Sequence, residues 1–131
     1  AATYIKMEKY DKAIADCDEA LRLNPRSVQA HNFRAATRHR TGDYDRAIAD
    51  YTESIRLNPR DPKAYAQRGL SYHKASKYDQ AIADLNEAIR LDPKLARAYH
   101  TRSLALEKKG NIAQAKADRS QAKRLDPTID D

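Results

Sequence analysis

Apolar residues recur along most of this chain at three- and four-residue intervals, with polar residues between them. That spacing places the apolar side chains on one face of a helix and predicts amphipathic α-helices. The expected helices span residues 28–41, 44–57, 62–76, 78–91, 96–109 and 112–125.

Turn-forming residues separate these segments in the way that helix ends require. Gly42 tolerates the left-handed conformation that ends a helix, and the carboxylate of Asp43 can cap the helix that follows. Asn58-Pro59 ends that helix, because proline cannot continue it, whereas Pro62 suits the first turn of the next one. The pattern predicts pairs of helices joined by short turns.

The same thirteen-residue passage occurs four times. It reads Ala-Ile-Ala-Asp, five further residues, then Arg-Leu-Asn/Asp-Pro, and begins at Ala13, Ala47 and Ala81, with a fainter copy at Ala115. Each copy starts 34 residues after the previous one, without insertion or deletion. A fixed period of this length is typical of stacked-repeat proteins, which present extended surfaces to partners.

These residues resemble the tetratricopeptide repeat family. Tyr65, Gly69 and Tyr72 occupy the places of its large aromatic, small and tyrosine residues, and the recurrent alanines and prolines complete the signature. The resemblance implies an all-α fold, a right-handed superhelical solenoid of stacked antiparallel helix pairs. We expect one domain over residues 1–131, with repeats at 1–27, 28–61, 62–95 and 96–129. The first copy would begin halfway through its first helix.

Two copies depart from the pattern. His31 and Arg38 replace the tyrosines of the third copy, so we expect more polar packing in the second, with His31 in an aromatic packing place. In the last copy Lys116, Arg119 and Lys123 replace apolar residues of the earlier copies. Terminal repeats need a polar outer face, so we interpret the last helix as a cap.

A second regularity joins the two helices of each copy. Arg34, Arg68 and Arg102 each precede an aspartate by 16 residues, namely Asp50, Asp84 and Asp118. Each arginine falls on the packed side of its helix, where a half-buried cation needs a partner. We predict a structural Arg–Asp ion pair within each of the three copies.

The opposite face of the first helices is the expected binding surface, since the resemblance implies that first helices line a concave groove. Its candidate partner-binding residues are Lys6, Asn32, Phe33, His39, Arg40, Lys63, Gln67, Leu70, His73, Lys74, Arg97, His100, Thr101 and Lys108.

Charge is concentrated on this face. It carries six lysines and arginines against Glu107 alone, a net of +5, and the whole chain is +6. A basic concave surface steers acidic or C-terminally anionic segments toward itself. We therefore expect a protein-interaction scaffold that binds an acidic peptide segment in this basic groove, with Phe33 and Leu70 accepting apolar side chains.

The best-known ligands of the family are acidic chaperone C-termini, held by a clamp of Lys, Asn, Asn, Lys and Arg. The matching places here hold Asn32, Ala36, Gln67, Arg97 and Thr101. Only Arg97 preserves a charge, so the resemblance does not extend to that clamp.

Two other partner classes remain open. The basic face also suits nucleic acid, although it has one Phe and no aromatic row for base stacking. The N-terminal edge could instead pair with a second copy of the chain, giving a homodimer.

Catalysis, metals and cofactors find no support in the motifs. There is no phosphate-binding glycine loop and no catalytic triad pattern, so we expect no enzyme and no cofactor. His39, His73 and His100 recur near one face, but a metal needs three or four converging ligands and we expect none. Cys17 aligns with Tyr51 and Leu85, which predicts a buried, inert thiol. A cytoplasmic location is the expectation, since a single cysteine gives no sign of an oxidising compartment.

Overall fold

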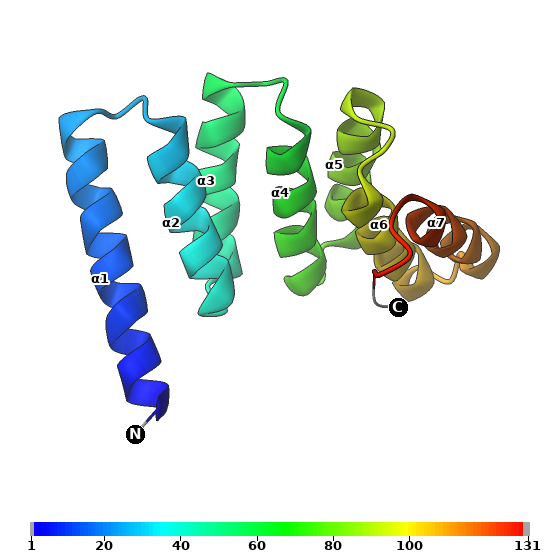
Figure 1. The fold of residues 1–131 in the computed structure, drawn as a ribbon, viewed down its shortest axis with the longest axis horizontal. Coiled ribbons are helices and arrows are strands. Elements are labelled where there is room, and N and C mark those ends of the chain that lie inside the picture. Colours follow the sequence, from blue (N-terminus) through cyan, green and yellow to red (C-terminus); the bar gives the residue numbers. More distant parts are fainter. Residues whose placement is uncertain (1, 130–131) are drawn as a thin grey trace. The chain divides into compact units, whose positions relative to one another are not determined.

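A computed structural model describes residues 2–129, with side chains from Lys6 onward. These residues form helices and no strand (Figure 1). The helices are α1 (Ala2–Leu23), α2 (Val28–Arg40), α3 (Tyr44–Leu57), α4 (Pro62–Lys74), α5 (Tyr78–Leu91), α6 (Ala96–Lys108) and α7 (Ile112–Leu125). The chain divides into two compact units, residues 1–59 and 60–131. The all-α fold of helix pairs is confirmed.

Turn chemistry sets the helix ends as the sequence predicts. The bounds of α3, α5 and α7 agree with prediction, while α2, α4 and α6 end one or two residues early. Gly42 and Gly110 take the left-handed conformation with φ of 85°, and Ser76 takes the same place in the third copy with φ of 64°. The side chain of Asp43 accepts a hydrogen bond from the backbone N–H of Arg46 and so caps α3.

The first copy differs from the prediction. The first copy was expected to begin halfway through the first helix of a pair, but α1 runs as one helix from Ala2 to Leu23, through Glu8 and Lys9 at the places of Gly42 and Asp43. Glu8 and Lys9 favour helix, and neither supplies a left-handed residue or a capping oxygen. Lys6 therefore lies on the same helix as Cys17 and not on a separate first helix.

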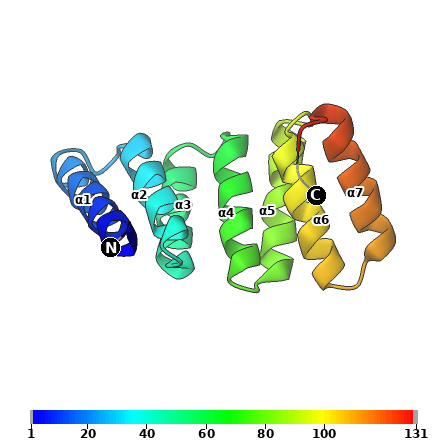
Figure 2. The same ribbon diagram turned by 60° about the horizontal axis from the view of Figure 1, so that its bottom comes forward.

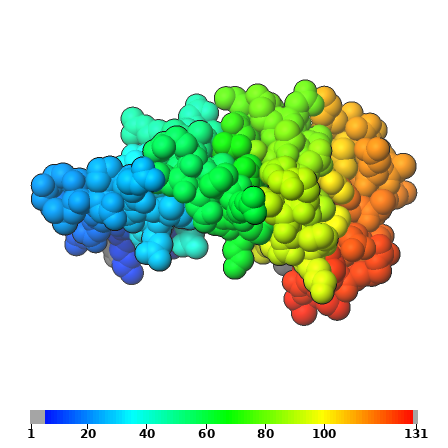
Figure 3. Space-filling model, turned by 90° about the horizontal axis from the view of Figure 1, so that it is seen from above, coloured from blue at the N-terminus to red at the C-terminus, as the bar shows by residue number. Residues whose placement is uncertain are grey.

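Small residues allow the helices of a pair to approach closely. In unit 1, Ala35 of α2 and Ala47 of α3 are fully buried beside Tyr51. In unit 2, Leu85 and Ala88 of α5 pack with Ala98 of α6. Figure 2 shows the members of each pair running side by side, and Figure 3 shows the second unit, from green to red, as a closely packed surface.

All three predicted Arg–Asp pairs are present. Nε and Nη2 of the arginine donate to the two carboxylate oxygens at 2.7–3.0 Å in the pairs Arg34–Asp50, Arg68–Asp84 and Arg102–Asp118. The aspartate side chains are only 5–9% exposed and the arginine side chains 17–23%. These hydrogen bonds raise the pKa of each arginine, so the guanidinium stays charged.

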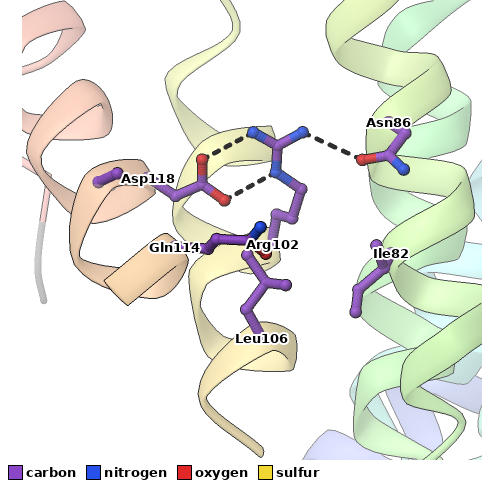
Figure 4. A pocket seen from close by; sticks show the side chains of 7 residues that line it. Ile82, Asn86, Arg102, Leu106, Gln114 and Asp118 are labelled. Carbon is purple, nitrogen blue, oxygen red and sulfur yellow. Dashed lines mark hydrogen bonds and ion pairs between the residues drawn. The ribbon is translucent and has the colours of Figure 1, made fainter. Parts of the chain in front are cut away.

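The arginine also reaches the second helix of the preceding copy. Nη1 of Arg34 donates to Asp18 of α1 at 2.8 Å, and Nη1 of Arg102 donates to Asn86 of α5 at 3.0 Å (Figure 4). One guanidinium therefore links three helices in each unit. The 16-residue spacing acts in both directions along the chain.

The more polar packing expected of the second copy is also confirmed. His31 is 8% exposed, and its Nε2 donates to the carbonyl of Pro25, as the hydroxyl of Tyr99 donates to Pro93 in the fourth copy. Arg38 donates a further hydrogen bond to Asp50 at 2.8 Å. Histidine thus replaces tyrosine without loss of the bond that holds the turn.

Replacing Ser76 by glycine should stabilise the protein. A non-glycine residue in the left-handed region is strained by about 1 kcal/mol, and the other two turns use glycine there. We expect a gain of roughly 0.5–1 kcal/mol in the free energy of unfolding, measured by urea titration. Gly42→Ser is the matched reverse change and should destabilise; stabilisation by both changes would contradict this reading.

Breaking one buried pair should cost far more than breaking an exposed one. Asp84→Ala leaves the half-buried guanidinium of Arg68 without its carboxylate, and we expect a loss of roughly 3 kcal/mol. Glu87→Ala, on the same helix, removes the surface partner of Arg90 and should cost far less, because solvent screens that pair. Equal losses in urea titrations of the two variants would show that the Arg–Asp pair has no special role.

Candidate partner-binding faces

The first helices of unit 2, α4 and α6, pack against each other and carry exposed cations at both ends. Lys63 and Arg97 lie in their first turns, and Lys74 and Lys108 are their last residues. All four side chains are exposed. Within the described residues, none of the four has a carboxylate within ion-pair distance.

Two acidic residues of unit 2, Glu107 and Asp79, bind cations outside this set. Glu107, counted above as the one opposing charge, accepts a hydrogen bond from Arg119 of α7 at 2.7 Å. Asp79 likewise pairs with Lys109 at 2.5 Å. The pKa of Asp126 is lowered mainly by hydrogen bonds from Thr128. The positive charge of Arg97 lowers it further, by a smaller amount. The positive charge of Lys74 and Lys108 is therefore not neutralised by any ion pair within the part of the chain that the structure describes.

His73 reports the resulting positive potential. Burial lowers the pKa of His73 below its ordinary value, and the charges of Lys74 and Lys108 lower it further. Its ring lies 5.5 Å from that of Tyr78, and His39 and Tyr44 form the same pair at 5.1 Å in unit 1. The last residues of α4 and α6, Lys74 and Lys108, thus both act on the same imidazole with their positive charge.

The remaining candidates in unit 2 separate into two groups. Gln67 is exposed and Leu70 is partly exposed, as a binding surface requires. His100 and Thr101 are only 9% and 5% exposed, because α6 packs against α4 on one side and α7 on another. These two were expected on the open face; their burial leaves them out of the contact set proposed below.

In unit 1 the candidates are spread over two helices. Lys6 is exposed on α1, Arg40 is exposed at the end of α2, and Asn32 and His39 are half-buried. Phe33 is 58% exposed, the most open aromatic residue among the described side chains. Unit 1 therefore offers an apolar side chain and fewer cations than unit 2.

Cys17 lies in the core, and the described residues bring no metal-ligand group together. Cys17 is 6% exposed, and burial raises the pKa of its thiol, as its alignment with Tyr51 predicts. No group of three His, Cys, Asp or Glu side chains within the described residues could hold a metal ion. In the same part of the chain, no helix is long and apolar enough to cross a membrane.

Sequence reasoning missed the links between neighbouring copies. The sequence analysis predicts only the aspartate 16 residues after each arginine. The residue 16 places before it is also a partner, as Asp18 is for Arg34 and Asn86 is for Arg102. The sequence analysis also counted Glu107 against the binding face, although the partner of this residue, Arg119, lies on the next helix. The first signal was present in the period; the second depends on side-chain packing.

Sequence models of one family match along the whole chain. Those described as "Tetratricopeptide repeat" match residues 1–62, 50–83 and 96–129, and one described as "TPR repeat" matches 69–110. The chain belongs to the tetratricopeptide repeat family. Domains of this family and fold are generally scaffolds for protein interactions.

Solved structures show the same fold. A crystal structure of MamA is 25% identical, with a TM-score of 0.84 over 96% of this chain and 74% of that one. The first repeat domain of Spaghetti (RPAP3), bound to the HSP90 peptide SRMEEVD, is 25% identical, with a TM-score of 0.75 over 78% and 81%. The second domain of human RPAP3, in complex with the HSP70 peptide SGPTIEEVD, is 30% identical, with a TM-score of 0.72 over 76% and 82%.

The titration of His73 tests the potential at the ends of α4 and α6. By NMR, the imidazole pKa should lie below its ordinary value and should rise in a Lys108→Gln variant, because one of the two neighbouring charges is gone. Lys94→Gln removes an exposed charge from the loop before α6 and should leave the pKa in place. An unchanged pKa of His73 in the Lys108→Gln variant would contradict this description.

The same shift makes stability depend on pH. The unfolded chain protonates this histidine near its ordinary pKa and the folded chain only at lower pH, so acidification favours unfolding between the two values. Wild type should therefore lose more stability than His73→Gln between roughly pH 7.5 and 5.5.

Proposed function

We propose that this repeat protein binds an acidic peptide segment of a partner protein on the first-helix face of unit 2. The observation that carries the proposal is the unpaired positive charge of Lys74 and Lys108 beside His73. Lys63 and Arg97 extend this charge to the other end of α4 and α6.

An acidic side chain would gain at this surface without displacing an existing ion pair. Among the described residues no carboxylate pairs with either lysine, and Glu107, which precedes Lys108 in the sequence, is held by Arg119. Lysine ammonium groups are point charges that accept carboxylates from several directions, which suits an extended segment. Leu70 and Gln67, between the two charged ends of α4, supply apolar and hydrogen-bonding contacts.

The peptides bound by similar structures are consistent with this chemistry. Both peptides in the RPAP3 complexes end in Glu-Glu-Val-Asp. The clamp residues that the family uses for such tails are not matched here, since Asn32 and Thr101 stand in the places of its Lys and Arg. Ala36 and Gln67 stand in the places of its two Asn residues. We therefore propose acidic segments as the ligand class and not the chaperone tails in particular.

A peptide-display selection on the full chain tests the ligand class. Selected peptides should be rich in Asp and Glu, and a Lys74→Glu, Lys108→Glu double variant should weaken their binding about tenfold or more, measured by fluorescence anisotropy. Raising the salt concentration from about 0.05 to 0.5 M should also weaken binding, since the charges lie at the surface.

A matched variant separates this face from net charge. Lys94→Glu with Lys116→Glu changes the total charge equally, at exposed positions away from the proposed face, and should bind as wild type does. Selection of neutral or basic peptides, or equal losses in both double variants, would overturn the proposal. Tighter binding of a 20-nucleotide single strand than of any peptide would assign the face to nucleic acid.

A further inference from the structure

Three helices of unit 2, namely α5, α6 and α7, surround an open cavity of about 380 Å³. Besides Asp118, the residues that line it are Ile82, Asn86, Arg102, Leu106, Gln114 and Ala117. Figure 4 shows Arg102 between Asp118 and Asn86, with Leu106 and Ile82 beside the same cavity. None of these residues belongs to the cationic set at the ends of α4 and α6, so the cavity is a separate site.

In the third copy, two aromatic rings lie over the equivalent arginine. The guanidinium carbon of Arg68 is 5.8 Å from the centre of the Tyr65 ring and 5.7 Å from the centre of the Tyr72 ring. A guanidinium is attracted to the face of an aromatic ring, because the π electrons concentrate negative charge there. The third copy therefore shows which side chains this arginine accepts as neighbours.

The fourth copy has only one of these rings. Arg102 lies 5.5 Å from the ring centre of Tyr99, the equivalent of Tyr65, but Leu106 stands in the place of Tyr72. Within the described residues, no second ring lies over this guanidinium. Leucine has no ring, and the cavity borders both Leu106 and Arg102. The cavity is therefore found beside the arginine that lacks its second aromatic neighbour.

The size and the chemistry of the cavity suit one aromatic side chain. Its volume is near the lower end of the roughly 300–1,000 Å³ of ligand pockets, which favours a single ring over a larger molecule. Leu106 and Ile82 offer apolar contacts to such a ring.

The mouth of the cavity carries groups that a polypeptide backbone can pair with. The exposed side chains of Asn86 and Gln114 are amides, which both donate and accept hydrogen bonds. The oxygen of Asn86 accepts from Arg102, whereas its NH₂ group and the amide of Gln114 have no hydrogen-bond partner among the described residues. A residue whose ring enters the cavity would place its own peptide groups near these amides.

We propose that this cavity binds a tyrosine side chain of a partner polypeptide, with the ring over the guanidinium of Arg102 and the adjoining backbone at Asn86 and Gln114. The tyrosines of this chain do not suit the role, because none of those with a described side chain is exposed. The proposal goes beyond the acidic-peptide function, since it uses other residues and a different kind of contact.

Acetyl-tyrosinamide, titrated into the isotope-labelled full chain and followed by NMR, is the probe. It should shift the methyl signals of Leu106 and Ile82 and the side-chain amide signals of Asn86 and Gln114 saturably. Acetyl-alaninamide, which has no ring, should give no saturable shift. p-Cresol, which has the ring without peptide groups, should bind about threefold or more weakly, because it cannot pair with the two amides.

Two substitutions fill or block the cavity. Leu106→Tyr supplies the ring of the third copy from within, so it should abolish binding of acetyl-tyrosinamide and raise the urea midpoint of unfolding. Leu104→Tyr adds the same ring to α6 at a partly exposed position outside the cavity and should bind as wild type does. Ala117→Trp narrows the mouth at an exposed position, without repacking the interior, and should weaken binding about tenfold or more.

The proposal is overturned if acetyl-tyrosinamide gives no saturable shift, or if Leu106→Tyr and Ala117→Trp both leave its affinity unchanged. Equal affinity for p-cresol would assign the cavity to a free phenol and not to a polypeptide. Self-association of the chain that Leu106→Tyr abolishes, seen by sedimentation, would make a second copy the occupant and overturn the proposal too. The Lys74→Glu, Lys108→Glu double variant should bind acetyl-tyrosinamide as wild type does, which separates this test from that of the acidic-peptide function.

Discussion

The fold of each unit depends on a guanidinium held between three helices. Arg34 joins α2 to Asp50 of α3 and to Asp18 of α1, and Arg102 joins α6 to Asp118 of α7 and to Asn86 of α5. Alanines bring the helices close enough for these bonds, and burial of the aspartates makes an unpaired member costly. The pair therefore couples packing within a copy to packing between copies.

This constraint also bears on the candidate binding surface of unit 2. The buried aspartates of unit 2, Asp84 and Asp118, form ion pairs with arginines. They therefore do not neutralise the exposed lysines at the ends of α4 and α6. Ion pairs therefore stabilise the interior of each unit, whereas the lysines at the surface of unit 2 are left to attract an acidic partner.

Much of this arrangement could be predicted from the sequence, because a strict 34-residue period places the helices, turns and buried ion pairs at equivalent positions in successive copies. The period does not predict the helix of the first copy, because Glu8 and Lys9 stand where the later copies have turn residues, and α1 continues through them. It also failed for Thr101, because helical spacing alone does not tell an open face from one covered by a neighbouring first helix. Partners of exposed charges, such as Arg119 for Glu107, needed the packed side chains.

A double-mutant cycle on Arg102 and Asp118 tests most directly whether the buried pair holds the helices together. The free energies of unfolding of Arg102→Ala, Asp118→Ala and the double variant would be compared with that of wild type by urea titration. If the pair acts as a unit, the double variant is more stable than the sum of the single losses implies, with a coupling energy of roughly 1–3 kcal/mol. Losses that add to within about 0.3 kcal/mol would show that the two residues stabilise the fold independently.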